Sequence, residues 1–228
     1  RSTPKPSSAA SDVYKRQSLT RAKEAIESGA FQNEVVPVTV SDRAGDRLID
    51  CDEQPLKGNV ENIPSLKPAF RKGGTVTAAN SSSISDGAAA LVLMRLSAAE
   101  RGGHVPLARI VGHAGHAQEP SLFTTAPVFA ISKLLKKLNW KTTDVDLYEI
   151  NEAFAVVTMA AMHDLELDHQ RVNRHGGACA LGHPIGASGA RIIVTLLSAL
   201  QRYDMHKGIA ALCIGGGEAT AMAFERLN

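Results

Sequence analysis

The sequence is poor in cysteine, in long apolar runs and in net charge, and each shortage excludes a class of protein. Its three cysteines, Cys51, Cys179 and Cys213, are too few and too scattered for a disulfide scaffold or a zinc site. No apolar run is long enough to cross a bilayer, and residues 1–17 lack the apolar core of a signal peptide. We therefore expect a protein of a reducing compartment with no membrane partner. The expected location is the cytoplasm, with mitochondrion and peroxisome as alternatives.

The charge of the chain is nearly balanced. Lysine and arginine together number 25 against 23 aspartates and glutamates, which gives a formal net charge of +2. No basic stripe emerges, so nucleic acid is not an expected partner. The 228 residues suffice for one large or two ordinary domains, and a hydrophobic fraction of 44% is typical of globular proteins.

The first third of the chain is the least regular part. Residues 1–17 are rich in serine, alanine and proline and show no periodicity, which predicts a disordered or non-native tail. Ordered sequence is expected from Ser18, with a helix that stops at Gly29 and a strand over residues 31–40. Residues 41–72 are polar and are expected to form an excursion away from the packed core.

Apolar segments of strand and helix length follow. Ala88–Met94 is a predicted buried strand. The other expected strands span residues 107–111, 145–150, 209–214 and 219–225, with a short strand at Val172, and the expected helices span residues 128–138, 153–165 and 192–200. Alternating elements of this length predict a layered α/β fold.

Three polar or titratable residues stand where predicted strands end: Asn151, His183 and Cys213. His183 lies in residues 171–191, which contain five glycines, and Pro184 restricts it to an extended conformation. In open α/β sheets, sites form beyond the carboxyl ends of strands, so these residues can converge. A cysteine with a histidine indicates thiolate chemistry. The alternatives are inert packing for Cys213, a helix cap for Asn151 and a tight connection with an incidental His183.

Five stretches resemble the thiolase family, in the order that the family requires. Asn151–Phe154, Gly176–Arg191 and Cys213–Gly217 are similar to its three C-terminal signatures, and Gly74–Ser83 and Asp86–Ala90 are similar to segments upstream of them. The resemblance covers the chain from about residue 18 onward and is closest to the acetyl-CoA acetyltransferases, or acetoacetyl-CoA thiolases. It implies a thiolase-like layered α/β/α fold.

The resemblance also implies an activity and a set of site residues. Thiolases join two acyl-CoA molecules by Claisen condensation, or run the reverse thiolysis, through an acyl-cysteine. By this resemblance Cys213 takes a proton from the incoming acetyl-CoA, and His183 activates the nucleophile and stabilises the enolate. Asn151 would hold a water beside His183, the N–H of Gly215 would form half of an oxyanion hole, and Ser82 would contact the pantetheine arm of CoA.

The nucleophilic cysteine that the family carries in its N-terminal half has no counterpart here. Cys51 is a poor substitute, because the neighbouring Asp50, Asp52 and Glu53 disfavour a thiolate. Cys179 fills a small-residue position of the glycine-rich stretch, where structural packing is the simpler role.

Another set of residues raises a metal site as an alternative. His113 and His116, with Glu119 beyond them, have a suggestive spacing but lack a fourth ligand, so solvated loop histidines are the expectation. The thiolase resemblance implies no metal and no cofactor, since the CoA thioester is a substrate.

The sequence thus predicts the C-terminal part of an acetyl-CoA C-acetyltransferase, inactive by itself. Beyond the tail, residues 18–84 would be part of a CoA-binding loop region, residues 85–103 the last strand and helix of the N-terminal domain, and residues 104–228 the C-terminal domain. Acetyl-CoA and acetoacetyl-CoA would be its ligands, and the parent a homodimer or homotetramer. The rival interpretations are a β-ketoacyl synthase relative and a non-catalytic CoA- or lipid-binding module.

Overall fold

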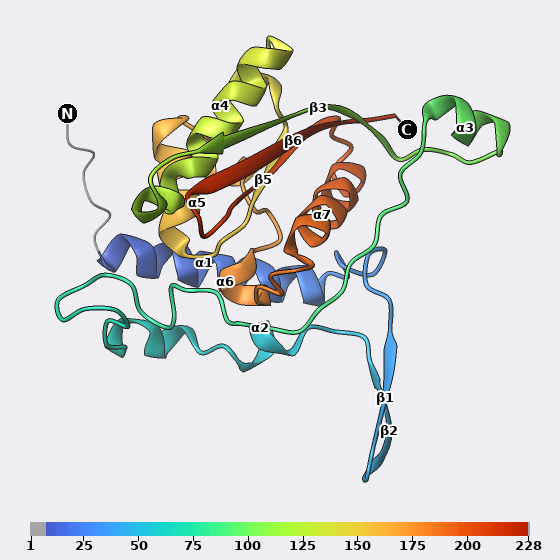
Figure 1. Cartoon of the computed structure of the whole chain (residues 1–228). Coiled ribbons are helices and arrows are strands. Elements are labelled where there is room, and N and C mark those ends of the chain that lie inside the picture. The colour runs from blue at the N-terminus through green and yellow to red at the C-terminus, as the bar shows by residue number, and fades with distance from the viewer. Residues whose placement is uncertain (1–7, 228) are drawn as a thin grey trace.

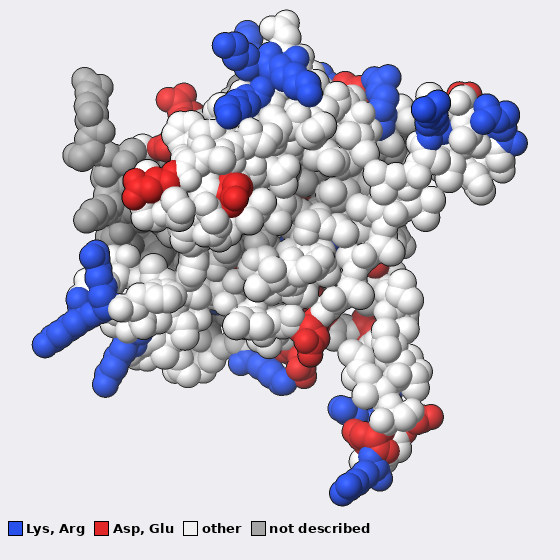
Figure 2. Space-filling model, in the orientation of Figure 1, with Lys and Arg blue, Asp and Glu red and all other residues white. Residues whose placement is uncertain are grey.

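The computed structural model describes residues 8–227 and has a mixed four-stranded sheet at its centre (Figure 1). The strands β3 (Ala108–Ala117), β6 (Glu218–Arg226), β5 (Lys207–Cys213) and β4 (Leu147–Ile150) lie in that order. β4 is parallel to β5, and the other pairs are antiparallel. A β-hairpin and a short helix project from this body, as the space-filling view also shows (Figures 1 and 2).

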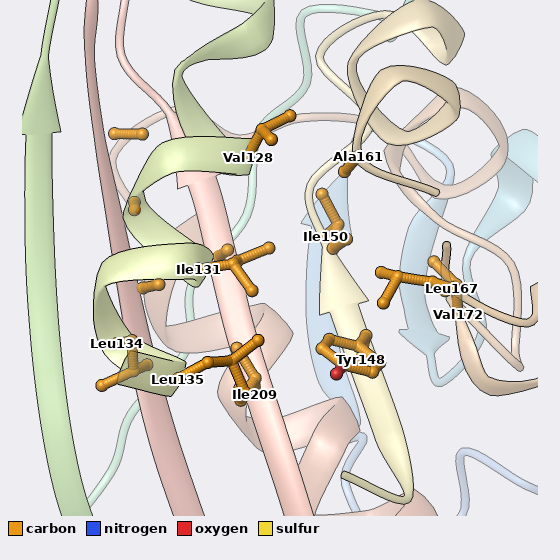
Figure 3. Packing of buried hydrophobic residues seen from close by; sticks show 14 of the residues in the cluster. Val128, Ile131, Leu134, Leu135, Tyr148, Ile150, Ala161, Leu167, Val172 and Ile209 are labelled. Carbon is orange, nitrogen blue, oxygen red and sulfur yellow. The ribbon is translucent and has the colours of Figure 1, made fainter. Parts of the chain in front are cut away.

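Helices cover both faces of the sheet. α4 (Ala126–Leu138) and α5 (Ala155–Asp164) pack on one face, and α7 (Ser188–Arg202) packs on the other. Alternate residues of a strand point to opposite faces, so Tyr148 joins the α4 side while Leu147 joins the α7 side. Figure 3 shows the α4 side, where Val128, Ile131, Leu134 and Leu135 share one buried cluster with Tyr148 and Ile150 of β4 and Ile209 of β5. The predicted layered α/β fold is confirmed.

Apart from the N-terminal helix described below, the remaining helices are short. They are α2 (Glu53–Lys57), α3 (Leu96–Arg101), α6 (Ala178–Leu181) and the 3₁₀ helices at Val60–Ser65, Pro120–Thr125, Thr142–Asp144 and His169–Arg171. The strand expected at Val172 is only a single parallel bridge to Tyr148.

The prediction of a disordered tail is wrong for residues 8–17; residues 1–7 lie outside the described part. A 20-residue helix, α1 (Ser8–Glu27), starts ten residues before the predicted beginning of order. Tyr14 is buried against Ala155 and Cys179, and its ring stacks on that of His169 at 5.4 Å between centroids. Several of the contacts that order this helix, such as those of Tyr14 and Ser18 with Glu152, come from residues more than 130 positions away, which local composition does not reveal.

The predicted strand over residues 31–40 is displaced toward the C-terminus. β1 (Val38–Asp42) pairs with β2 (Gly45–Ile49) in a hairpin within the segment expected to be a polar excursion. The backbone N–H of Ala44 donates to Asp42 Oδ1 at 2.7 Å, and Gly45 has φ +111°, so the turn suits these residues. Every residue of both strands is exposed, and the hairpin tip carries charges of both signs (Figure 2).

The predicted buried strand Ala88–Met94 is also wrong. These residues form no strand in the structure, and the chain runs extended across the molecule toward α3 (Figure 1). A strand needs a neighbour to satisfy its backbone groups, and none of residues 8–227 pairs with this segment. Apolar side chains are therefore exposed within this segment and in the chain on either side of it. The residues called the apolar strip below are Ile84, Val92, Leu93, Val105 and Leu107.

Elsewhere the surface is sparsely charged in the view of Figure 2, where lysines and arginines gather over α4. Lys136 and Lys137 lie in the last turn of that helix. Among the described residues, no helix has both the length and the apolar character that a bilayer span requires.

A group of charged side chains lies between the sheet and α7, largely shielded from solvent. Glu149 of β4 faces Arg191 of α7, with 3.8 Å between Oε2 and Nη1. Thr195 donates to Glu34 Oε1 at 3.1 Å, while Glu34 Oε2 is buried and has no hydrogen-bond partner within residues 8–227. Burial raises the pKa of Glu149 to about 8 and that of Glu34 to about 7, although Arg191 opposes both shifts.

We predict that the apolar strip binds a hydrophobic dye such as anilinonaphthalene sulfonate. The double substitution Val92→Ser/Leu93→Ser should lower dye fluorescence while changing the free energy of unfolding by less than about 0.5 kcal/mol, since both side chains are exposed. Lys136→Ser is the matched surface control. Dye fluorescence that is the same in all three proteins would contradict the prediction.

We predict that stability falls as pH rises from 6.5 to 8. The folded chain holds a proton on Glu149 in this window that the unfolded chain releases, because the folded pKa of about 8 exceeds the ordinary value of 4.5. Glu149 should therefore cost at most about 1.4 kcal/mol for each pH unit, and Glu34, with a folded pKa of about 7, adds to this loss at the lower end of the window. The histidines with lowered pKa, His169, His175 and His183, act in the opposite direction, mainly below about pH 7, where the unfolded chain still binds protons on them.

Urea unfolding at several pH values measures this dependence. Glu149→Gln should reduce the slope throughout this window and leave the contribution of Glu34 near pH 7, whereas Glu24→Gln on the exposed side of α1 should leave the profile unchanged. A parental slope that persists in Glu149→Gln would assign the dependence to other groups.

Candidate functional site

Asn151 stands at the carboxyl end of β4, where the parallel pairing with β5 places it. Its backbone N–H donates to the carbonyl of Ala211 at 2.9 Å, which continues the β4–β5 ladder by one step. The residue before it, Ile150, is bound on both backbone groups by the Asn173 side chain, at 2.8 Å each. Asn151 is 1% exposed, so its amide is fixed inside the protein.

His183 lies in the connection between α6 and α7. Its backbone N–H donates to the carbonyl of Ser83 at 2.9 Å, which joins this loop to the segment before the apolar strip. Its ring Nδ1 lies 2.6 Å from the hydroxyl of Ser188, and that hydroxyl donates its proton to the carbonyl of Pro184 at 3.0 Å. Ser188 can therefore only accept from His183, and the ring carries its proton on Nδ1.

The structure brings Asn151 and His183 together. Asn151 Nδ2 lies 3.3 Å from His183 Nε2, the ring nitrogen that the Ser188 contact leaves without a proton. Burial, with a smaller contribution from Arg191, lowers the pKa of His183, which favours the neutral ring at pH 7. Asn151 Oδ1 is buried and has no hydrogen-bond partner among the described residues, so it is available to a donor that enters the site.

Cys213 is the last residue of β5, the strand that neighbours β4. Its side chain faces the α4 side of the sheet and is 8% exposed. Burial raises the pKa of its thiol to about 11, so the protonated form prevails at pH 7 and the thiolate, when formed, is a strong base. Asn151 and Cys213 thus occupy the same edge of the sheet, because the Asn151 N–H binds the residue two positions before Cys213.

Gly215 lies exposed in the turn between β5 and β6. Gly217, which closes this turn, has φ +99°, and a Cβ there would lie 2.3 Å from the carbonyl oxygen of Gln118. The turn therefore requires glycine at this position.

Ser82, which lies outside the sheet, binds the loop that follows Asn151. Its N–H and its hydroxyl both donate to the carbonyl of Ala153, at 3.1 and 2.9 Å, and it is half-buried. Ser82 thereby supports the loop after Asn151, and its neighbour Ser83 supports His183. An open groove of about 380 Å³ adjoins the histidine loop and is lined by residues 85–89 and 184–187.

Two residues of this site escaped the sequence analysis. Ser188 determines which ring nitrogen of His183 carries the proton. The feature of the sequence that could have identified it is its position five residues after His183 in the glycine-rich stretch. Glu152 is fully buried directly after Asn151, and its partners are scattered along the chain, so no local pattern marks it.

The other cysteines lie apart from this geometry. The pKa of Cys51 is raised by partial burial and by the charges of Asp52 and Asp50. Cys179 is buried, and its pKa lies well above the ordinary value because of burial and the nearby charge of Glu152. Neither environment favours a nucleophilic thiolate.

The histidines considered for metal binding have other contacts. The ring of His116 stacks on Phe129 at 4.7 Å, and its Nε2 lies 3.0 Å from Gln118 Oε1. Within residues 8–227, no group of three or more histidine, cysteine, aspartate or glutamate side chains is arranged to hold a metal ion.

Comparison with known proteins places this site in a family. The family model described as "Thiolase, C-terminal domain" matches residues 104–226, and "Thiolase, N-terminal domain" matches residues 6–97. The match therefore begins before residue 18, where the sequence analysis had placed its start. Acetyl-CoA acetyltransferase of Escherichia coli K12 is 51% identical over 95% of this chain and 55% of its own length. The mitochondrial acetyl-CoA acetyltransferase of Bos taurus is 48% identical over 95% of this chain and 51% of its own length.

Solved structures agree with these relatives. The acetyl-CoA acetyltransferase of Bacillus anthracis superposes with a TM-score of 0.92 at 45% identity, over 95% of this chain and 55% of its own. Acat5 thiolase of Ascaris suum, crystallised in complex with coenzyme A, superposes with a TM-score of 0.85 at 38% identity, over 97% of this chain and 56% of its own. The chain spans about half the length of the curated relatives it matches, and it belongs to the thiolase family.

Proposed function

We propose that this chain is the C-terminal half of an acetyl-CoA C-acetyltransferase, which condenses two acetyl-CoA molecules to acetoacetyl-CoA and CoA or runs the reverse thiolysis. The observation that carries the proposal is the 3.3 Å contact between Asn151 Nδ2 and His183 Nε2, at the sheet edge where Cys213 ends the neighbouring strand. These three residue types suit proton transfer at a carbon next to a thioester.

In the first half-reaction, a cysteine supplied by the other half attacks the carbonyl carbon of acetyl-CoA. The bond from that carbon to the CoA sulfur breaks, and the released thiolate takes up a proton. His183 is neutral with an unprotonated Nε2, so, once the thiol takes the place of the Asn151 contact at this nitrogen, it can accept the proton of the attacking thiol and return it to CoA. The N–H of Gly215 is our candidate for half of the oxyanion hole.

In the second half-reaction, the Cys213 thiolate removes a proton from the methyl carbon of a second acetyl-CoA. The resulting enolate oxygen would be stabilised by the His183 side of the site and by a water bound to Asn151, whose Oδ1 lacks a partner. The enolate carbon then attacks the acyl-cysteine, the bond from the acyl carbon to the enzyme sulfur breaks, and the proton that Cys213 removed passes to that sulfur, which restores the thiol nucleophile and the Cys213 thiolate. In the cleavage direction Cys213 is the acid, a role that its pKa of about 11 suits.

The remaining assignments belong to this proposal. Residues 18–84 would contribute to CoA binding, with Ser82 at the pantetheine arm, residues 85–103 would end the N-terminal domain, and residues 104–228 would form the C-terminal domain. CoA thioesters would be substrates, and the chemistry requires no further cofactor. The parent would be a cytoplasmic dimer or tetramer.

Two rival functions differ in testable ways. A β-ketoacyl synthase relative would use two active-site histidines, whereas the loops after β4 and β5 carry Asn151 and Cys213. A non-catalytic CoA- or lipid-binding module would bind CoA and show no turnover in any form of the protein.

The direct test joins the N-terminal part of the E. coli relative to this chain in one polypeptide. We expect the chimaera to form acetoacetyl-CoA from acetyl-CoA and to cleave it when CoA is present, while the 228-residue chain alone is inactive. CoA binding by a folded chimaera without turnover in either direction would favour the binding-module alternative.

Within the chimaera, Cys213→Ser should lower the condensation rate at least about 100-fold, because a hydroxyl is a much weaker base than a thiolate. Acetyl transfer to the enzyme, followed separately with radiolabelled acetyl-CoA, should suffer far less. His183→Ala should slow both half-reactions, and Cys51→Ser is the matched cysteine control. If Cys213→Ser condensed at the parental rate, the base would be another group, with Cys179 the next thiol to test.

A further inference from the structure

A fully buried carboxylate lies directly behind Asn151. Glu152 is 0% exposed, and each of its oxygens accepts two hydrogen bonds. Oε1 accepts from the Tyr14 hydroxyl at 2.8 Å and from Asn173 Nδ2 at 2.9 Å. Oε2 accepts from the Ser18 hydroxyl at 2.8 Å and from the backbone N–H of Cys179 at 3.1 Å.

Only a carboxylate satisfies this set of donors. An amide at the same place would direct its NH₂ group at one of the two pairs, whichever way it turned. On each side one donor, the Asn173 amide or the Cys179 backbone, cannot become an acceptor without moving. The space is equally specific, because a Cβ on Gly177 would lie 2.3 Å from the Glu152 carboxyl carbon.

The contacts of Glu152 hold both loops that carry the proposed site. On the strand side, Asn173 Nδ2 binds Glu152 and the carbonyl of Ile150, so the residues before and after Asn151 share one anchor. On the other side, Oε2 holds Cys179, four residues before His183, through its backbone N–H.

Helix α1 completes the arrangement. Tyr14 and Ser18 supply two of the four donors, and Ser18 also accepts from the backbone N–H of Gly177 at 3.0 Å. The Lys15 ammonium group contacts the carbonyl of Cys179. A segment more than 130 residues upstream therefore fixes the spacing of the two loops.

We propose that Glu152 is a positioning residue, which acts with Tyr14 and Ser18 of α1 to hold Asn151 at hydrogen-bonding distance from His183 Nε2. Glu152 does not face the substrate in this role; it acts through Asn151 and through the backbone of the α6 segment. The inference extends the proposed function, but its consequence is a property of the His183 ring and requires no turnover.

The test is ¹⁵N NMR of histidine-labelled 228-residue chain, with the His183 signals identified by their loss in His183→Gln. The parent should show a protonated Nδ1 and an unprotonated Nε2. In Glu152→Gln the Ser188 contact should keep the proton of the neutral ring on Nδ1, while the Nε2 signal should shift and the apparent pKa should rise toward the ordinary value as Asn151 withdraws its hydrogen bond from Nε2. Asn151→Ala should give the same change, and the double variant should add nothing to either single variant.

Two further variants keep the result interpretable. Tyr14→Phe removes one donor and should give a smaller change of the same kind, which decides the question if Glu152→Gln does not fold. Leu134→Ala, in the α4 layer, should lower the unfolding midpoint and leave the His183 signals as in the parent.

A lowered midpoint with parental His183 signals in Glu152→Gln and Tyr14→Phe would overturn the positioning role. The effects of Glu152→Gln and Asn151→Ala adding in full would overturn it as well, because Glu152 would then act independently of Asn151. Conversely, the predicted NMR changes together with an inactive chimaera would contradict the proposed function alone.

Discussion

A buried carboxylate is stable only where hydrogen-bond donors replace the water that it lost, and Glu152 meets this condition with donors from α1 and from residues 173–179. The requirement places α1 against α5 and α6, brings Asn173 to the end of β4, and excludes a side chain at Gly177. Removing one partner would leave the others facing an unmatched charge, so the arrangement is cooperative. The proposed site inherits its geometry from this anchor.

The sheet and its covering helices were predictable because their signals are local. Val145–Ile150 and the run from Ile209 are apolar at strand length, and α4 and α7 carry apolar residues at helical spacing. Asn151 and Cys213 stand at strand ends as predicted, whereas the prediction was wrong for His183, which lies between α6 and α7; the contact between Asn151 and His183 is nevertheless present. Their roles remain predictions that rest on the family resemblance.

The errors concern segments whose state depends on remote partners. Tyr14 looks like part of a featureless tail until Glu152, 138 residues away, is placed beside it. Ala88–Met94 has the composition of a buried strand, yet no strand among the described residues pairs with it, and it stays extended and exposed. The composition of a segment indicates which secondary structures it can form, whereas the neighbouring segments determine which of them it adopts.

Under the proposed function, two halves of a polypeptide share the chemistry of one site. This chain supplies the proton-transfer groups, and the other half supplies the sulfur that accepts the acyl group. Mass spectrometry of the chimaera, quenched in acid after incubation with acetyl-CoA, tests this division directly. The account predicts an acetyl group on a cysteine of the added half, with Cys51, Cys179 and Cys213 unmodified, and no acetylation of the 228-residue chain alone. An acetyl group on Cys213 or Cys179 would contradict it, since the nucleophile would then lie within this chain.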